Sequence, residues 1–118
     1  MKDYVPSDLV QAANDANLAA EEAIEALYDM EIYKENAKDI LAKIMCSFRA
    51  GNDGKISEAE LERRARASED WVTFREEQFK AIKVGMAAKV KMQNTKLYFD
   101  AIQSALSFRK MEMSRLGD

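Results

Sequence analysis

The chain has 118 residues, of which 47% are hydrophobic and 33% charged, and its net charge is −3. This composition is typical of a soluble helical protein and argues against a disordered or membrane-spanning chain. With no histidine and a single cysteine, His-based triads, the common zinc sites and an internal disulfide are excluded. Because no phosphate-binding loop or nucleophile motif is present either, we expect a non-enzymatic protein with no cofactor and no bound metal.

The N-terminus and the cysteine bear on where the protein works. The opening MKDYVPSD lacks the apolar region of a secretory signal, and no apolar run approaches the roughly 18 residues that cross a bilayer. We therefore expect a cytoplasmic protein that forms one helical domain over residues 1–118. No base accompanies Cys46 in the sequence, so we predict a small core residue rather than a nucleophile.

The first predicted element is a long helix over residues 7–50. Ser7 and Asp8 provide a start signal, and apolar residues then recur at helical spacing. The first half is dominated by alanines, which let another helix approach closely but bury little area each. They are Ala12, Ala13, Ala16, Ala19, Ala20, Ala23 and Ala26.

A loop and a short helix follow. The stretch GNDGK at 51–55 is rich in turn residues and predicts the loop. Ser57 and Glu60 have the spacing of a capping box, which predicts a short helix over 57–66.

The same region resembles the loop of an EF-hand. Gly54 and Glu60 occupy the sixth and twelfth positions as a calcium loop requires. Arg49 and Gly51 stand at the first and third positions, where oxygen ligands belong. We therefore expect no calcium binding, with Asp53 and Glu60 as the only charged ligands.

The third predicted element is a long helix over residues 68–116, opened by Ser68. Its apolar residues form a stripe that we expect another element to cover. Gln93, Asn94 and Thr95 interrupt this stripe, which leaves a bend, a polar layer or a break as alternatives. The stripe consists of Val72, Phe79, Ile82, Met86, Val90, Leu97, Ala101, Ala105 and Phe108.

From Leu97 onward a second apolar arc lies beside the first, and together they make an apolar face that is too wide for one partner helix to cover. We therefore predict a homo-oligomer contact there. The predicted fold class is all-α: a long antiparallel helical hairpin, coiled-coil-like, with a short helix near the turn. The arc adds Tyr98, Phe99, Ile102, Leu106 and Met113.

Charge is distributed unevenly. Residues 1–60 hold 13 acidic and 6 basic residues, whereas residues 61–118 hold 8 acidic and 12 basic ones. Between residues 78 and 111 the bases are opposed by Asp100 alone, so this segment is a candidate for phosphate contact. The alternative is that it pairs with the acidic first helix. The candidate nucleic-acid-binding residues are Lys80, Lys83, Lys89, Lys91, Lys96, Arg109 and Lys110.

On a helical wheel, part of this basic set lies outside the main stripe together with an aromatic ring, as sequence-tolerant strand binding requires. Phe99 could stack on bases or belong to a subunit interface, and we favour the interface. The group comprises Lys89, Met92, Lys96, Phe99, Gln103 and Lys110.

About the last 65 residues resemble the UvsY family of phage recombination mediators. The resemblance implies an oligomeric protein that binds single-stranded DNA and helps to load a RecA-like recombinase in place of single-strand-binding protein, in the cytoplasm of a bacterial host. The alternative is a non-catalytic structural or adaptor protein, such as a phage assembly component, which the absence of a basic pI favours. The matching residues are Lys55, Ser57, Glu58, Ala59, Glu60, Asp70, Trp71, Arg109 and Lys110.

Overall fold

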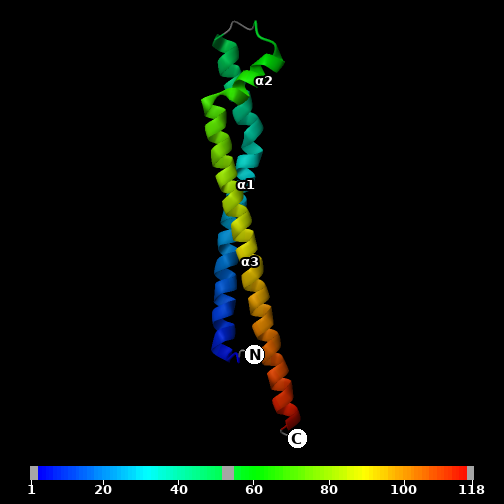
Figure 1. Cartoon of the computed structure of the whole chain (residues 1–118). Helices are drawn as coiled ribbons and strands as arrows, with labels where there is room; N and C mark the ends of the chain where they lie inside the picture. Colours follow the sequence, from blue (N-terminus) through cyan, green and yellow to red (C-terminus); the bar gives the residue numbers. More distant parts are fainter. Residues whose placement is uncertain (1–2, 52–54, 117–118) are drawn as a thin grey trace. The chain divides into compact units, whose positions relative to one another are not determined.

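The computed structural model describes residues 3–51 and 55–116, and within them all regular structure is helical. Helix α1 spans Pro6–Gly51, α2 spans Glu58–Ala67 and α3 spans Glu69–Leu116 (Figure 1). The all-α prediction is confirmed, and each helix end lies within one residue of its predicted position. None of these helices combines the length and apolar character that crossing a bilayer requires.

Two compact units share the long helices. The hairpin unit comprises residues 26–85, and the terminal unit comprises the described parts of residues 1–25 and 86–118. Each unit contains one portion of α1 and one portion of α3, and the hairpin unit also contains α2.

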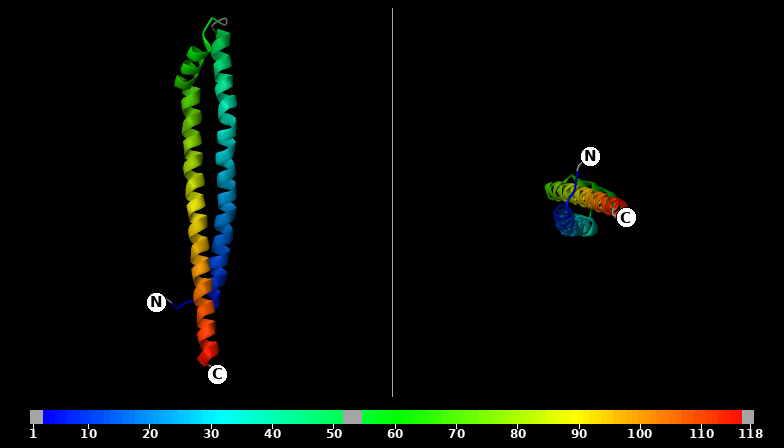
Figure 2. Two further views of the ribbon diagram at one scale, coloured as in Figure 1. Left: turned by 90° about the vertical axis from the view of Figure 1, so that its right-hand side faces the viewer. Right: turned by 90° about the horizontal axis from the view of Figure 1, so that it is seen from below.

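In the hairpin unit, α1 and α3 run antiparallel, and α2 crosses α1 before the chain enters α3 (Figures 1 and 2). The core joins all three helices: Ile44 from α1, Ala65 from α2, and Trp71 and Phe74 from α3. The rings of Trp71 and Phe74 stack with their centroids 5.4 Å apart. Two large rings of the unit are therefore part of this core, where aromatic side chains bury much apolar surface.

Two serines set the limits of α2. The Ser57 hydroxyl accepts a hydrogen bond from the Glu60 N–H at 3.3 Å, which confirms the predicted N-cap. Ser68 is extended and ends α2, and its hydroxyl donates to the Ala65 carbonyl at 2.6 Å. The same hydroxyl accepts from the Trp71 N–H at 3.2 Å. One side chain therefore satisfies the end of one helix and the start of the next, so the chain restarts at Ser68 in a new helix.

The terminal unit pairs the alanine-rich part of α1 with the C-terminal part of α3. Ala12, Ala19 and Ala23 are at most 2% exposed, and Ile102 of α3 is fully buried. Lys91 contacts Glu22, and Arg109 contacts Tyr4, so the two helical segments run antiparallel here as well. The predicted close approach of the alanine-rich half to another helix is confirmed.

The face of α3 that packs within the chain is not the predicted stripe. Buried and half-buried residues of α3 recur at alternating spacings of three and four, the pattern of a coiled-coil seam. The residues at these spacings are Trp71, Phe74, Gln78, Ala81, Gly85, Ala88, Met92, Thr95, Phe99, Ile102 and Leu106, and the half-buried Arg75 and Ile82 lie beside this line.

The predicted stripe lies about half a turn away from this seam. Val72, Met86 and Leu97 are 45%, 51% and 65% exposed, and of the nine predicted residues Ile82 alone is half-buried. The described residues of the chain therefore do not cover the stripe, and the prediction that something covers it is not met within the chain itself. Trp71, Phe74 and Ile102 are among the residues of α3 that are buried on the seam instead, and the stripe is left on the opposite side.

The residues of the second predicted arc also fall into two groups, one on the seam and one exposed. Ile102 is buried, and Phe99 and Leu106 are half-buried on the seam within the terminal unit, whereas Tyr98 and Met113 are exposed. Phe99 thus lies on the line of residues that packs within the chain, and its assignment to a subunit interface stays a prediction.

The structure also answers two questions that the sequence left open: whether α3 breaks at its polar interruption, and whether Cys46 lies in the core. Helix α3 continues without a break through Gln93, Asn94 and Thr95. The Thr95 hydroxyl donates to the carbonyls of Lys91 and Met92 at 3.0 and 2.9 Å, so a half-buried polar group is satisfied inside the helix. Cys46 is exposed, which contradicts its prediction as a core residue.

Gly85 marks a close approach of the two helices in the hairpin unit. A Cβ atom built there would lie 3.3 Å from the Ala26 carbonyl oxygen and 3.3 Å from the Met30 sulfur. The oxygen belongs to the backbone of α1 and cannot rotate away. A glycine in the middle of a long helix costs about 1 kcal/mol relative to alanine, and the close packing at this point offsets that cost.

We expect Gly85→Leu to lower the free energy of unfolding by roughly 1–3 kcal/mol through overpacking, although leucine is the better helix former. Urea denaturation followed by circular dichroism measures this. Ala42→Leu, at an exposed position of α1 in the same unit, is the matched control and should change stability by less than about 0.5 kcal/mol. Equal stability of Gly85→Leu and the unmodified protein would contradict the close approach.

Candidate nucleic-acid interface

All seven predicted basic residues lie on α3 with exposed side chains, but the structure divides them among different surroundings. Lys80 and Lys83 belong to the hairpin unit, and the other five belong to the terminal unit. Within the described residues, the ion pairs of this set are limited to Lys91 with Glu22. The set therefore does not form one patch, and its members have different neighbours.

Two of the seven contact other parts of the terminal unit. The Lys91 Nζ atom lies 3.1 Å from a carboxylate oxygen of Glu22 on α1. The Arg109 guanidinium donates a hydrogen bond to the Tyr4 carbonyl at 2.9 Å. Arg109 thus holds the segment that precedes α1, and the ring of Tyr4 meets that of Tyr98 edge-on at 6.2 Å. These two bases already have intrachain roles, which makes them weaker candidates for phosphate contact.

In the terminal unit, Lys89, Lys96 and Lys110 form the group that has neither an ion pair nor a hydrogen bond among the described residues, here called the lysine edge. They are separated by multiples of seven residues, which places them along one side of α3 at intervals of about 10 Å or twice that. Within the described part of the chain none of the three forms an ion pair. The three lysines therefore lie along the same side of α3, and their ammonium groups are not neutralised by acidic side chains of the described residues.

The neighbouring helix explains why these lysines differ from Lys91. Glu22 lies on one edge of the α1 seam, and the opposite edge carries Ala13 and Ala20. In an antiparallel helix pair, like edges face each other, so Lys91 meets the carboxylate side of α1 and the lysine edge flanks the alanine side. The predicted pairing with the acidic first helix is confirmed for Lys91 and is not observed for the lysine edge.

The aromatic and thioether side chains expected beside these lysines face elsewhere. Met92 and Phe99 are half-buried on the seam, so the predicted mixture of ammonium groups and a stacking ring on one exposed surface is wrong. The lysine edge can supply charge to a strand's phosphates, but Phe99 does not supply a stacking platform.

The resemblance to an EF-hand does not extend to the structure. Helix α1 continues through Arg49 and Gly51, the first and third loop positions, and Arg49 forms an ion pair with Glu58. Asp53 and Gly54 lie outside the described residues. Among residues 3–51 and 55–116, no three acidic, cysteine or histidine side chains converge as a metal site would require.

Glu60, the twelfth position of that motif, is engaged by two arginines instead. Its carboxylate accepts hydrogen bonds from Arg63 at 2.6 Å and from Arg64 at 3.1 Å. The hydrogen bond from Arg63, then that from Arg64, lowers the pKa of Glu60 from 4.5 to about 2. These contacts are local to α2 and stabilise its first turns.

The residues that carry the resemblance to recombination mediators have mixed roles. Ser57 caps α2 and Trp71 lies in the core of the hairpin unit, so the fold accounts for both. Lys110 belongs to the lysine edge. Comparisons of the chain with protein-family models, with curated proteins and with solved structures found no match.

The lowered pKa predicts a pH-dependent contribution of Glu60 to stability. A carboxylate whose pKa is lower in the folded state stabilises the fold above its unfolded pKa and loses that contribution as pH falls through the folded value. The melting temperature of Glu60→Gln should therefore lie furthest below that of the unmodified protein above about pH 4.5, and the gap should close toward pH 2.

Glu76→Gln is the control, because Glu76 is exposed and forms no ion pair within the described residues. A gap for Glu60→Gln that is the same at pH 7 and pH 2 would show that charge pairing with Arg63 and Arg64 is not its source.

Proposed function

We propose that this chain is a non-enzymatic, single-stranded DNA-binding protein of the recombination-mediator type that contacts phosphates through the lysine edge of α3. The observation that supports the proposal is the arrangement of Lys89, Lys96 and Lys110: one direction, regular spacing, and no ion pair within the described part of the chain. A recombinase partner and a cytoplasmic location in a bacterial host follow from the resemblance and belong to the same proposal.

The physics of such binding suits a row of lysines on a helix. An ammonium group is a point charge on a flexible stem, so it can reach a phosphate without fixing the geometry of the strand. Each neutralised phosphate releases counterions, which drives binding without regard to base sequence. Contacts separated by about 10 and 20 Å along one helix can follow an extended strand.

The acidity of the neighbouring helix limits where the strand can lie. Residues 6–25 of α1 contain five acidic residues and no basic one, so this part of α1 repels phosphate. Binding must therefore be confined to the side of α3 that the lysine edge occupies. We expect moderate affinity with strong salt dependence, as a short row of charges on an acidic protein provides.

A second candidate, a structural or adaptor protein, has its own supporting observation. Large apolar side chains on α3 are exposed opposite the seam, among them Val90 at 52% and Phe108 at 63%. A surface of this kind is typical of protein–protein contact. The two candidates use different sides of α3, so they can be tested separately.

The double variant Lys89→Gln, Lys110→Gln should weaken binding to a single-stranded oligonucleotide. The plot of log affinity against log salt should also become shallower by about 1.4, which is 0.7 for each lost phosphate contact. Fluorescence anisotropy over a salt series measures both quantities. Lys96 is left unchanged in this variant because it also borders the apolar side of α3.

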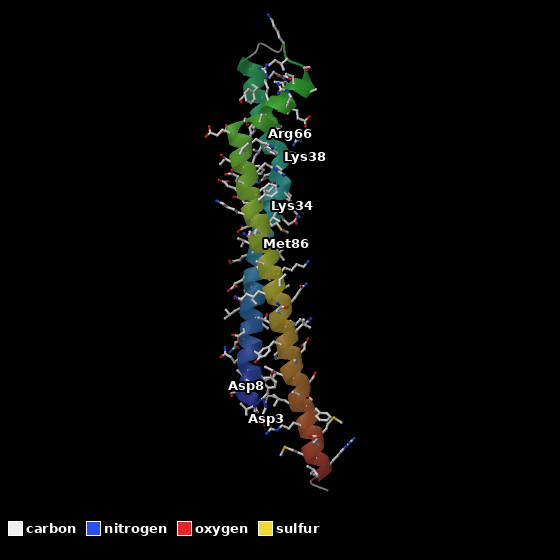
Figure 3. The ribbon with its side chains drawn as sticks, viewed as in Figure 1. Asp3, Asp8, Lys34, Lys38, Arg66 and Met86 are labelled. Carbon is white, nitrogen blue, oxygen red and sulfur yellow. The ribbon has the colours of Figure 1, made fainter. Side chains whose placement is uncertain are left out.

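Lys34→Gln, Lys38→Gln is the matched control, since it removes the same charge from exposed positions of α1 (Figure 3). It should leave the salt dependence of binding unchanged. No binding by the unmodified protein at about 0.1 M salt, or equal loss in the two double variants, would contradict the proposal and favour the adaptor candidate.

A further inference from the structure

The outer face of α3 in the terminal unit is an apolar surface that its own chain leaves uncovered. We define it by Met86, Val90, Leu97, Ser104 and Phe108, which fall within about 40° of one line on a helical wheel. This line lies about half a turn from the seam. The four large side chains are 51%, 52%, 65% and 63% exposed.

The size of these side chains makes the face unusual for a surface helix. Scattered exposed apolar residues need no explanation, but a row of them along one side of a helix marks a contact surface. α1 already occupies the opposite side of α3 with small residues, so the chain has no further helix in this unit for the outer face.

Charge beside the outer face indicates what covers it. Asp100 is the one acidic residue between positions 78 and 111, and it follows Lys96 by four residues on the same rim of the face. Within the described residues neither Lys96 nor Asp100 takes part in an ion pair, although their spacing would permit one along the helix. Both charges are therefore available to an incoming helix.

We propose that the outer face of α3 binds the same face of a second copy of this chain, with the two α3 helices antiparallel and a two-fold axis near Leu97. In that register Leu97 faces its own counterpart. Met86 and Phe108 lie eleven residues to either side of Leu97, so each meets the other on the second copy. Val90 and Ser104 are related in the same way, at seven residues.

The same register pairs the charges. Lys96 lies one residue before Leu97 and Asp100 three after it, so each comes beside its opposite charge on the second copy, because like rims face each other in an antiparallel pair. The two-fold axis makes this contact twice. The surface is thus self-complementary in charge as well as in apolar character, which a closed dimer requires.

Other arrangements fit less well. In a parallel two-fold pair of α3 helices each rim faces the opposite rim of the second copy, so the rim with Lys96 and Asp100 would not meet its counterpart and the two charges could not pair. Docking on α1 of a second copy would set the apolar side chains against Glu21 and Glu25, which are exposed on α1 away from its seam. Burial beside Leu97 would then cost the desolvation of carboxylates.

Cysteine cross-linking tests the register in a Cys46→Ser background, because Cys46 is itself exposed. Leu97→Cys should form a disulfide-linked dimer under mild oxidation. Ser104→Cys lies on the same face, but in this register its two copies are about 20 Å apart and should not cross-link. A mixture of Ser104→Cys with Val90→Cys should again give the dimer.

Light scattering without DNA tests the charges and the apolar contact. The unmodified protein should have the mass of two chains. Leu97→Glu or Asp100→Lys should shift it toward one chain with unchanged helical content, and Lys96→Asp combined with Asp100→Lys should restore the dimer.

A one-chain mass for the unmodified protein at about 100 µM, or cross-linking of Ser104→Cys with itself but not of Leu97→Cys, would overturn the proposal. The proposal would also be overturned if the variant that combines Lys96→Asp with Asp100→Lys did not recover the two-chain mass of the unmodified protein. Since none of these measurements involves DNA, their outcome is independent of whether the lysine edge binds a strand.

Discussion

The close packing of α1 against α3 is the constraint on which the other features of this structure depend. In the hairpin unit the backbone of α1 approaches Gly85 so closely that even a methyl group would touch it. In the terminal unit the buried residues of α1 are alanines, each at most 2% exposed. Two helices that meet through small side chains gain contact by proximity rather than by area. With α1 on this side of α3, the apolar side chains on the opposite side, such as Leu97 and Phe108, are left exposed.

The seam also decides which charges are neutralised. Once α1 occupies one side of α3, residues on the two edges of the seam meet different edges of α1. Lys91 meets Glu22, whereas Lys89 and Lys96 flank the alanines. Nothing about the lysines themselves distinguishes them, since all are exposed and of the same type. They differ because they face different sides of α1. Within the basic segment, Lys91 is therefore paired with an acidic residue, whereas the lysine edge is not.

Two proposed surfaces, the lysine edge and the outer face, lie side by side on the terminal part of α3. Lys96 borders both, so a two-fold pair of chains would bring two lysine edges into one assembly. A protein that binds an extended strand by repeated weak charge contacts gains from such repetition, because a second set of contacts acts at high effective concentration. The two proposals are thus compatible, although each rests on its own observations.

The sequence by itself determined the all-α class, the three helices and the capping role of Ser57, because propensity and caps depend on neighbours along the chain. The basic segment was also predictable as a set of residues. The tertiary structure decided which face of α3 packs inward. Both faces are apolar at helical spacing, and Gln78, Gly85 and Thr95 interrupt the apolar pattern of the inner one.

That choice depends on α1, which packs against Gly85 and the rest of the seam and leaves the row from Met86 to Phe108 uncovered. The structure likewise decided that Phe99 faces the seam, that Cys46 is exposed, and that Thr95 is satisfied within an unbroken helix. Each of these depends on a contact or a hydrogen-bond geometry between elements or turns, which spacing along a single chain does not specify.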